Sequence, residues 1–249
     1  NHLLPIERWF FNLELKNFNH WFQAISLSIP IAQDSEKILN ALTIIHEMHQ
    51  AFSYRWKRNN STYEFFTNND TQFELIELTN EQSFNNVESD LNRINIESGP
   101  LSIIFYHSGQ TTRLLWVIHH LIIDTLSWRV LIDDLINIIF NRKLNQGIRS
   151  VRNRDYLDGD YVSTEEYSSY WNQQYEIVNS WNHFDSKTGT YAEEKKIRHD
   201  FSNRTTTEID NLEKLGFNAE EVLLTALLNV FSFKNFPQGI NITLEHHGR

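Results

Sequence analysis

The sequence predicts a mixed α/β fold, with strands and helices interspersed along 249 residues. Two observations indicate this. Residues 101–120 contain two segments rich in branched and aromatic side chains on either side of a Ser-Gly-Gln turn at 108–110, as in two strands joined by a turn. Segments with an apolar residue about every 3.6 positions precede and follow this pair, as in amphipathic helices. We therefore expect a mixed sheet flanked by helices.

The first of these helices is predicted at 35–56, where Ser35 stands in the N-cap position. Its apolar positions keep a helical period: Ile38, Leu39, Leu42, Ile45, Met48 and Phe52. Two short strand candidates follow, at 62–66 and 72–78.

Residues 81–96 are predicted to form a further helix, which the Gly-Pro pair at 99–100 ends. The second segment of the strand pair, 111–120, is almost entirely apolar, which is typical of a strand covered on both faces. After it, Ser127 can cap a helix through 128–140. The buried side of that helix is expected to carry Val130, Leu131, Leu135, Ile138 and Ile139.

The remainder of the chain is more polar at first. Residues 143–165 carry scattered glycines and charges, and they predict a crossing over the surface. A tyrosine-rich helix at 165–181, a strongly apolar helix at 220–236 and a strand at 240–245 are expected to follow. With 40% hydrophobic residues, the chain can bury the core of one large domain or of two small ones.

Composition excludes several classes of function. The formal net charge of −10 opposes attraction to phosphate, so we expect no nucleic-acid partner. The absence of cysteine excludes disulfides, thiolate metal sites and a cysteine nucleophile. No apolar stretch approaches the roughly 20 residues of a membrane span, and the N-terminal residues do not resemble a signal peptide. We expect a soluble, cytoplasmic protein without a membrane partner.

No motif predicts a metal or a nucleotide. His46 and His49 lie one position short of the i, i+4 spacing of a helical zinc motif. The sequence also lacks a glycine-rich phosphate loop and a G-x-S-x-G nucleophile elbow. We expect neither a bound metal nor a directly bound cofactor.

Two adjacent histidines, His119 and His120, end the apolar strand. Neighbouring side chains on a strand point to opposite faces, so one imidazole is expected to be structural and the other exposed to something. Both could equally be packed residues at a strand end. Asp124 and Ser127 follow within a turn, at a strand-to-helix transition where α/β folds often place reactive groups. A histidine there can move protons near neutral pH.

Asp124 also has a structural interpretation, as a helix-start residue or a loop-fixing acceptor that holds His120 in one orientation. A second cluster, Glu245-His246-His247-Gly248-Arg249, follows the last predicted strand. Taken by itself, this cluster reads as a charged surface loop.

Several stretches, taken together and in order, resemble the epimerization branch of the condensation-domain superfamily of nonribosomal peptide synthetases. IHHLIIDTLSWRVLIDDL is similar to its HHxxxDG motif and the SWR continuation of that motif. LPIERWFF resembles its opening block, VLLTALLNVF its D-x-L-L-x-A block, and EHHGR its E-G-H-G-R block. The resemblance runs from about residue 3 to the end and is weakest across 143–165.

This resemblance implies the chloramphenicol acetyltransferase-like fold, with residues 1–249 as its N-terminal lobe, truncated after the glutamate block and lacking a C-terminal lobe. It also implies inversion of Cα in an aminoacyl or peptidyl thioester. That substrate arrives on the phosphopantetheine arm of a peptidyl carrier protein, beside neighbouring synthetase domains. His120 and Glu245 would be catalytic, supported by His119, Asp124, Ser127 and Arg249.

Three departures from the family pattern leave alternatives open. Thr125 replaces a glycine, which matters if that position needs a positive φ. His246 replaces the glycine after the catalytic glutamate, and Ser53 stands where the family often has an arginine, so Arg55 or Arg249 would have to pair with Asp124.

A condensation domain that forms a peptide bond is the closest alternative. In that reading His120 would assist an attacking amine and Glu245 would have no counterpart. A non-catalytic module that docks carrier proteins is another alternative.

Overall fold

The computed structural model describes residues 3–60, 62–69, 73–144, 168–173, 193, 195 and 197–232. The chain forms two compact units, residues 1–161 and 162–249, which are described separately.

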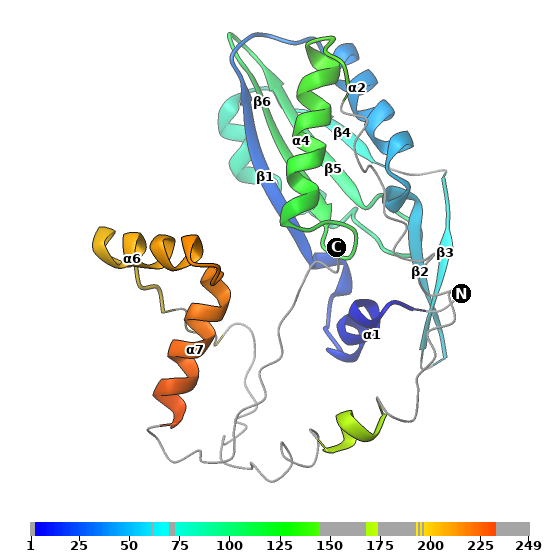
Figure 1. The fold of residues 1–249 in the computed structure, drawn as a ribbon. Coiled ribbons are helices and arrows are strands. Elements are labelled where there is room, and N and C mark those ends of the chain that lie inside the picture. Colours follow the sequence, from blue (N-terminus) through cyan, green and yellow to red (C-terminus); the bar gives the residue numbers. More distant parts are fainter. Residues whose placement is uncertain are drawn as a thin grey trace. The chain divides into compact units, whose positions relative to one another are not determined.

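The first unit is built on a mixed four-stranded sheet in the order β1-β6-β5-β4 (Figure 1). Strand β6 pairs antiparallel with β1 and β5, whereas β4 pairs parallel with β5. The strands are β1 Phe22–Ile29, β4 Glu74–Glu77, β5 Ser102–Ser108 and β6 Thr112–His119. A separate antiparallel hairpin consists of β2 Tyr54–Asn59 and β3 Thr62–Thr67. The predicted strand pair at 101–120 is confirmed.

Helices flank this sheet, as the sequence predicts. The first unit contains α1 Pro5–Asn12, α2 Ser35–Met48, α3 Glu88–Leu91 and α4 Thr125–Ile139. Short 3₁₀ turns lie at Phe18–His20, Gln50–Ser53 and Glu81–Asn86. Within the described residues, no helix is long and apolar enough to span a bilayer.

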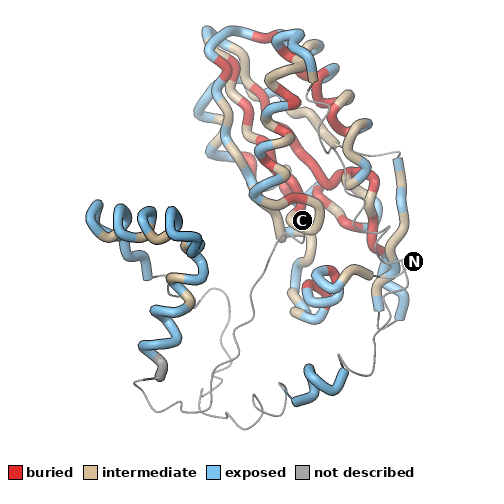
Figure 2. Tube along the Cα trace, in the orientation of Figure 1, coloured by how far each residue is buried: buried red, intermediate tan, exposed pale blue. Residues whose placement is uncertain are grey.

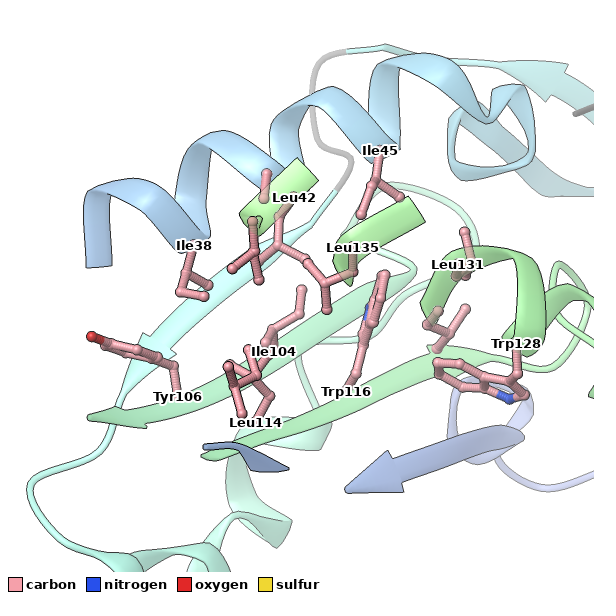
Figure 3. Packing of buried hydrophobic residues seen from close by; sticks show 14 of the residues in the cluster. Ile38, Leu42, Ile45, Ile104, Tyr106, Leu114, Trp116, Trp128, Leu131 and Leu135 are labelled. Carbon is pink, nitrogen blue, oxygen red and sulfur yellow. The ribbon is translucent and has the colours of Figure 1, made fainter. Parts of the chain in front are cut away.

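Helices α2 and α4 cover one face of the sheet (Figure 1). Trp116 of β6 is fully buried beneath them and packs edge-on against Trp128 of α4. The apolar side of α2 completes this cluster (Figure 3) with Ile38, Leu42 and Ile45. Burying each of these side chains stabilises the fold by about 1.5–3 kcal/mol before entropic costs.

A second cluster covers the opposite face of the sheet. Val117 of β6 and Phe105 of β5 pack there against Leu91 and Ile94. Strand β6 is therefore buried on both faces (Figure 2), which confirms the expectation from its apolar sequence.

Two predicted helices differ from the structure. The helix predicted at 35–56 ends at Met48, because His49 has extended backbone angles and a 3₁₀ turn follows before β2. Phe52 still fits the apolar pattern because it is buried from that turn. In the region 81–96, a 3₁₀ turn precedes the one-turn helix α3, and the side chain of Asn80 caps that 3₁₀ turn.

The second unit contains α6 Asn203–Lys214 and α7 Ala219–Ser232. Helix α7 confirms most of the helix predicted at 220–236. Of the helix predicted at 165–181, residues 168–173 are described and are helical. Residues 145–165 of the predicted surface crossing and the strand predicted at 240–245 lie outside the described residues.

Candidate active site

His119, the last residue of β6, is a structural histidine. Its side chain is completely buried. Nε2 donates a hydrogen bond to the carbonyl oxygen of Phe18 at 2.8 Å, and Nδ1 accepts one from the backbone N–H of Leu121 at 3.2 Å. Burial lowers the pKa of His119 to about 4, and the hydrogen bond to Phe18 opposes this shift only partly. The ring is therefore neutral at neutral pH, and both of its nitrogens are hydrogen-bonded to the backbone.

His120 follows the end of the strand and is half-buried. Its backbone N–H donates to the carbonyl oxygen of Trp21 at 2.8 Å, and its ring lies nearly parallel to the Trp21 indole. Nδ1 donates to the carbonyl oxygen of Ile123 at 2.9 Å. The two neighbouring histidines thus face different surroundings. Strand alternation is not the reason, because β6 ends at His119 and His120 lies in the turn that follows.

The second ring nitrogen of His120 meets a side chain that sequence reasoning did not identify. Its Nε2 lies 3.1 Å from the amide nitrogen of Gln23 in β1. The amide oxygen of Gln23 accepts a hydrogen bond from Nε1 of Trp128 at 2.9 Å. Strand β1, the end of β6 and the first turn of α4 therefore converge on one imidazole.

A signal for Gln23 was present in the sequence. Gln23, Ile25, Leu27 and Ile29 alternate with more exposed residues along β1. A polar residue in this inward-facing register marks a position with a specific partner.

Asp124 caps helix α4. Its Oδ1 accepts a hydrogen bond from the backbone N–H of Ser127 at 2.7 Å. The helix therefore begins at Thr125 with Asp124 as the N-cap, three residues before the start implied by a Ser127 cap. This contact agrees with the interpretation of Asp124 as a helix-start residue.

The substitution at Thr125 carries no backbone strain. Thr125 is the first residue of α4, and its φ is not positive. The threonine therefore fits where the family pattern has glycine.

Ser53 and Arg55 lie in the core of the first unit. The Ser53 hydroxyl donates to the carbonyl oxygen of Gln50 at 2.7 Å. The Arg55 guanidinium is fully buried, and its Nη1 donates to the carbonyl oxygens of Phe52 and Tyr54. Burial lowers the pKa of Arg55 from its ordinary value.

The remaining sequence-predicted site residues, Glu245 and Arg249, lie outside the described residues, as does His246. Their association with His120 therefore stays a prediction. Of the candidate residues, the structure brings His119, His120, Asp124 and Ser127 into one strand-to-helix turn.

The other histidines considered at the start do not form a metal site. His46 is buried between Phe52 and Phe73, and Nδ1 donates to the carbonyl oxygen of Leu42. Nε2 of His49 lies 3.0 Å from Oδ2 of Asp134 in α4, at hydrogen-bonding distance. Among the described residues, no group of three acidic or histidine side chains is placed to hold a metal ion.

A family model described as Condensation domain matches residues 2–249. The chain belongs to the condensation domain family. Gramicidin S synthase 1 from Brevibacillus brevis is 29% identical over 280 residues, which cover 99% of this chain and 25% of that protein. Tyrocidine synthase 1 from Brevibacillus parabrevis is 26% identical, again over 99% of this chain and 25% of that protein.

Among solved structures, the epimerization domain from the third module of tyrocidine synthetase B has a similar fold. It superposes with a TM-score of 0.56 at 21% identity, covering 76% of this chain and 44% of that chain. This likeness concerns the fold, and it agrees with the mixed sheet flanked by helices. This chain spans less than half of that structure and a quarter of each of the two synthetases.

The two adjacent imidazoles differ in the kind of hydrogen-bond partner that their nitrogens have. His119 is committed to the backbone through both nitrogens, whereas His120 has one nitrogen committed to the backbone and one facing a side chain. A side-chain partner can be exchanged for a substrate more readily than a backbone partner that fixes the turn. His120 is accordingly the candidate for chemistry.

Proposed function

We propose that this chain takes part in inverting the Cα stereocentre of an aminoacyl or peptidyl thioester. The substrate is carried on the phosphopantetheine arm of a peptidyl carrier protein during nonribosomal peptide synthesis. The proposal assigns proton transfer to the imidazole of His120 and the carboxyl group of Glu245. The C-terminal lobe of the same domain and neighbouring synthetase domains are the other proposed partners.

The observation that carries this proposal is that the two adjacent histidines have different hydrogen-bond partners. His119 is buried and neutral, and His120 presents Nε2 to the side chain of Gln23. The sequence motifs that resemble the epimerization branch, including the SWR continuation and the final EHHGR block, support epimerization in particular.

Epimerization suits these residue types chemically. Inversion removes a proton from one face of Cα and returns one to the opposite face, so two groups that gain and lose protons are needed. The thioester carbonyl acidifies the Cα proton and takes up the charge of the carbanion as an enolate. A hydrogen-bond donor near that oxygen would lower the barrier further. The backbone N–H of Ser127 already donates a hydrogen bond to Asp124, so this N–H is poorly placed to stabilise the enolate oxygen.

A deuterium-exchange experiment tests the proposal. The protein is incubated in deuterated water with a stand-alone carrier protein loaded with a panel of L-aminoacyl thioesters. We expect deuterium at Cα by mass spectrometry and formation of the D-isomer by chiral chromatography. Replacing His120 by Ala or Glu245 by Gln is expected to lower the rate about 10²- to 10⁴-fold. Gln82→Glu, on the exposed surface, serves as the control.

Peptide-bond formation is the second candidate function, and membership of the condensation domain family is equally compatible with it. In this case His120 assists an amine that attacks a donor thioester, and Glu245 has no role. Donor-loaded and acceptor-loaded carrier proteins then give a new amide bond without deuterium at Cα. If carrier protein binds but neither product forms, both catalytic assignments fail and a docking module remains.

A further inference from the structure

We propose that Gln23 is a positioning residue that keeps Nε2 of His120 free of a proton, so that His120 enters the reaction as the proton acceptor. The catalytic part of this inference rests on the proposed epimerization. The protonation of His120 is a property of the protein alone, and it can be measured without any reaction.

The first step concerns the orientation of the Gln23 amide. The indole Nε1 of Trp128 is a donor only, so the atom of Gln23 that faces it at 2.9 Å must be the oxygen. The amide NH₂ is thereby directed toward His120, 3.1 Å from Nε2. Trp128 is held in place by burial and by its edge-on contact with Trp116.

The second step concerns the imidazole. The carbonyl oxygen of Ile123 can only accept, so Nδ1 of His120 carries a hydrogen. The amide NH₂ of Gln23 can only donate, so Nε2 must accept, which it does only while unprotonated. The two neighbours together select the neutral Nδ1–H form of the ring. The ring also lies nearly parallel to the indole of Trp21, with 6.3 Å between the ring centroids.

Packing alone does not account for a glutamine at this position. Gln23 lies in the same inward register of β1 as Ile25 and Leu27, and it pairs with Ile118 of β6. An apolar side chain would fill this register without a polar group to satisfy. The amide instead connects Nε1 of Trp128 to Nε2 of His120 and satisfies both of these polar atoms.

The corresponding chemical step is a proton transfer. The Cα–H bond of the carrier-bound thioester breaks, the proton passes to Nε2 of His120, and the electron pair forms the enolate with the thioester carbonyl. Gln23 gives up its hydrogen bond to the lone pair during this step. Under the proposed function, the carboxylic acid of Glu245 gives its proton to the opposite face of Cα and becomes a carboxylate. The cycle closes when His120 releases its proton to solvent and this carboxylate takes one up from solvent.

Nitrogen-15 NMR of histidine-labelled protein tests the positioning role. We expect His120 to show a protonated Nδ1 and an unprotonated Nε2, and His119 to show the reverse pattern in the same spectrum. His120→Asn identifies the signals. Gln23→Glu replaces the donor by an acceptor of the same shape, so both nitrogens of His120 are expected to become protonated. Gln82→Glu adds the same charge at an exposed site and should leave both patterns unchanged.

A second variant covers the case in which the buried carboxylate prevents folding. Gln23→Met keeps the length of the side chain and removes its donor. We expect the Nε2 signal of His120 to move toward that of a nitrogen without a hydrogen bond. An unchanged Nε2 signal in Gln23→Met, or a protonated Nε2 in the unmodified protein, would overturn the inference.

The kinetic test separates this inference from the proposed function. If both are correct, Gln23→Glu lowers kcat for deuterium exchange by about 10²-fold or more, with a smaller change in KM, because the acceptor acts in the chemical step. If the NMR patterns are as expected but the unmodified protein exchanges no deuterium, the epimerization proposal fails while the positioning by Gln23 stands. If exchange occurs but Gln23→Glu leaves kcat unchanged, His120 is not the acceptor.

Discussion

His119 and His120 are adjacent, yet their hydrogen bonds place the proton on opposite ring nitrogens. His119 donates from Nε2 to the carbonyl oxygen of Phe18, and His120 donates from Nδ1 to the carbonyl oxygen of Ile123. The end of β6 lies between the two residues, so each ring meets a different set of acceptors. The imidazole of His119 supports the fold, and that of His120 is the one to which we assign proton transfer.

Replacing each histidine by alanine should therefore separate stability from activity. His119→Ala removes the partner of the partly buried carbonyl of Phe18 and of the N–H of Leu121, and it leaves a cavity where the buried ring stood. We expect a loss of about 2–4 kcal/mol in the free energy of unfolding, measured with urea. His120→Ala should cost less stability because this side chain is only half-buried, while deuterium exchange is lost. Equal losses of stability in the two variants would contradict this division.

Acid should destabilise the first unit through its buried histidines. Burial lowers the pKa of His46 to about 3 and that of His119 to about 4, while both groups titrate near 6.5 in the unfolded chain. The unfolded state therefore binds more protons between these values. The stabilisation is complete above about pH 6.5, and it is lost as the pH falls toward 4 and then 3. Each histidine contributes up to about 1.4 kcal/mol per pH unit within its window.

The variant His46→Phe tests that dependence. His46 stacks near Phe73, and its buried Nε2 has no hydrogen-bond partner, so phenylalanine should be tolerated at pH 7. Urea midpoints measured between pH 7 and pH 5 should then fall less steeply than in the unmodified protein. An identical slope would show that His46 does not titrate on unfolding.

The capping role of Asp124 can be separated from a catalytic role by two substitutions. Asparagine can accept the same hydrogen bond from the N–H of Ser127, whereas alanine cannot. We expect Asp124→Asn to keep most of the stability and Asp124→Ala to lose about 1 kcal/mol, measured by thermal unfolding. If Asp124→Asn abolishes activity while preserving stability, the carboxylate has a further role beyond the cap.

The contact between His49 and Asp134 joins the end of α2 to α4. Both side chains are mostly buried, with exposed fractions of 12% and 3%. A double-mutant cycle with His49→Ala and Asp134→Ala should give a coupling energy of about 1–3 kcal/mol. Asp133→Asn, at the exposed neighbouring position, should change stability by less than about 0.5 kcal/mol. A coupling energy near zero would show that the two groups act independently.

Much of the fold could be predicted from periodicity. The strand pair at 101–120, helix α4 and helix α7 follow patterns that depend on local burial. The boundaries were less predictable, since Phe52 keeps a helical spacing although the helix has ended at Met48. The apolar pattern records which side chains are buried, and a 3₁₀ turn buries them as well as an α-helix does.

The site was predictable only where its residues are close in the sequence. His119, His120 and Asp124 fall within one turn, so their different roles could be inferred from the predicted strand end and from capping preferences. Gln23 was missed because its contact with His120 spans 97 positions. Only the antiparallel pairing of β1 with β6 brings these residues together. A single sequence does not state which strands pair.

The same pairing has a consequence for how the protein matures. Strand β1 is translated early, but it has no partner until β6 has been made, and such distant pairings form slowly. Synthesis of β6 delivers His120 at the same time as the strand that pairs with β1, so the imidazole and the amide of Gln23 come together only then. Trp128, which orients that amide, follows within the next ten residues of the chain.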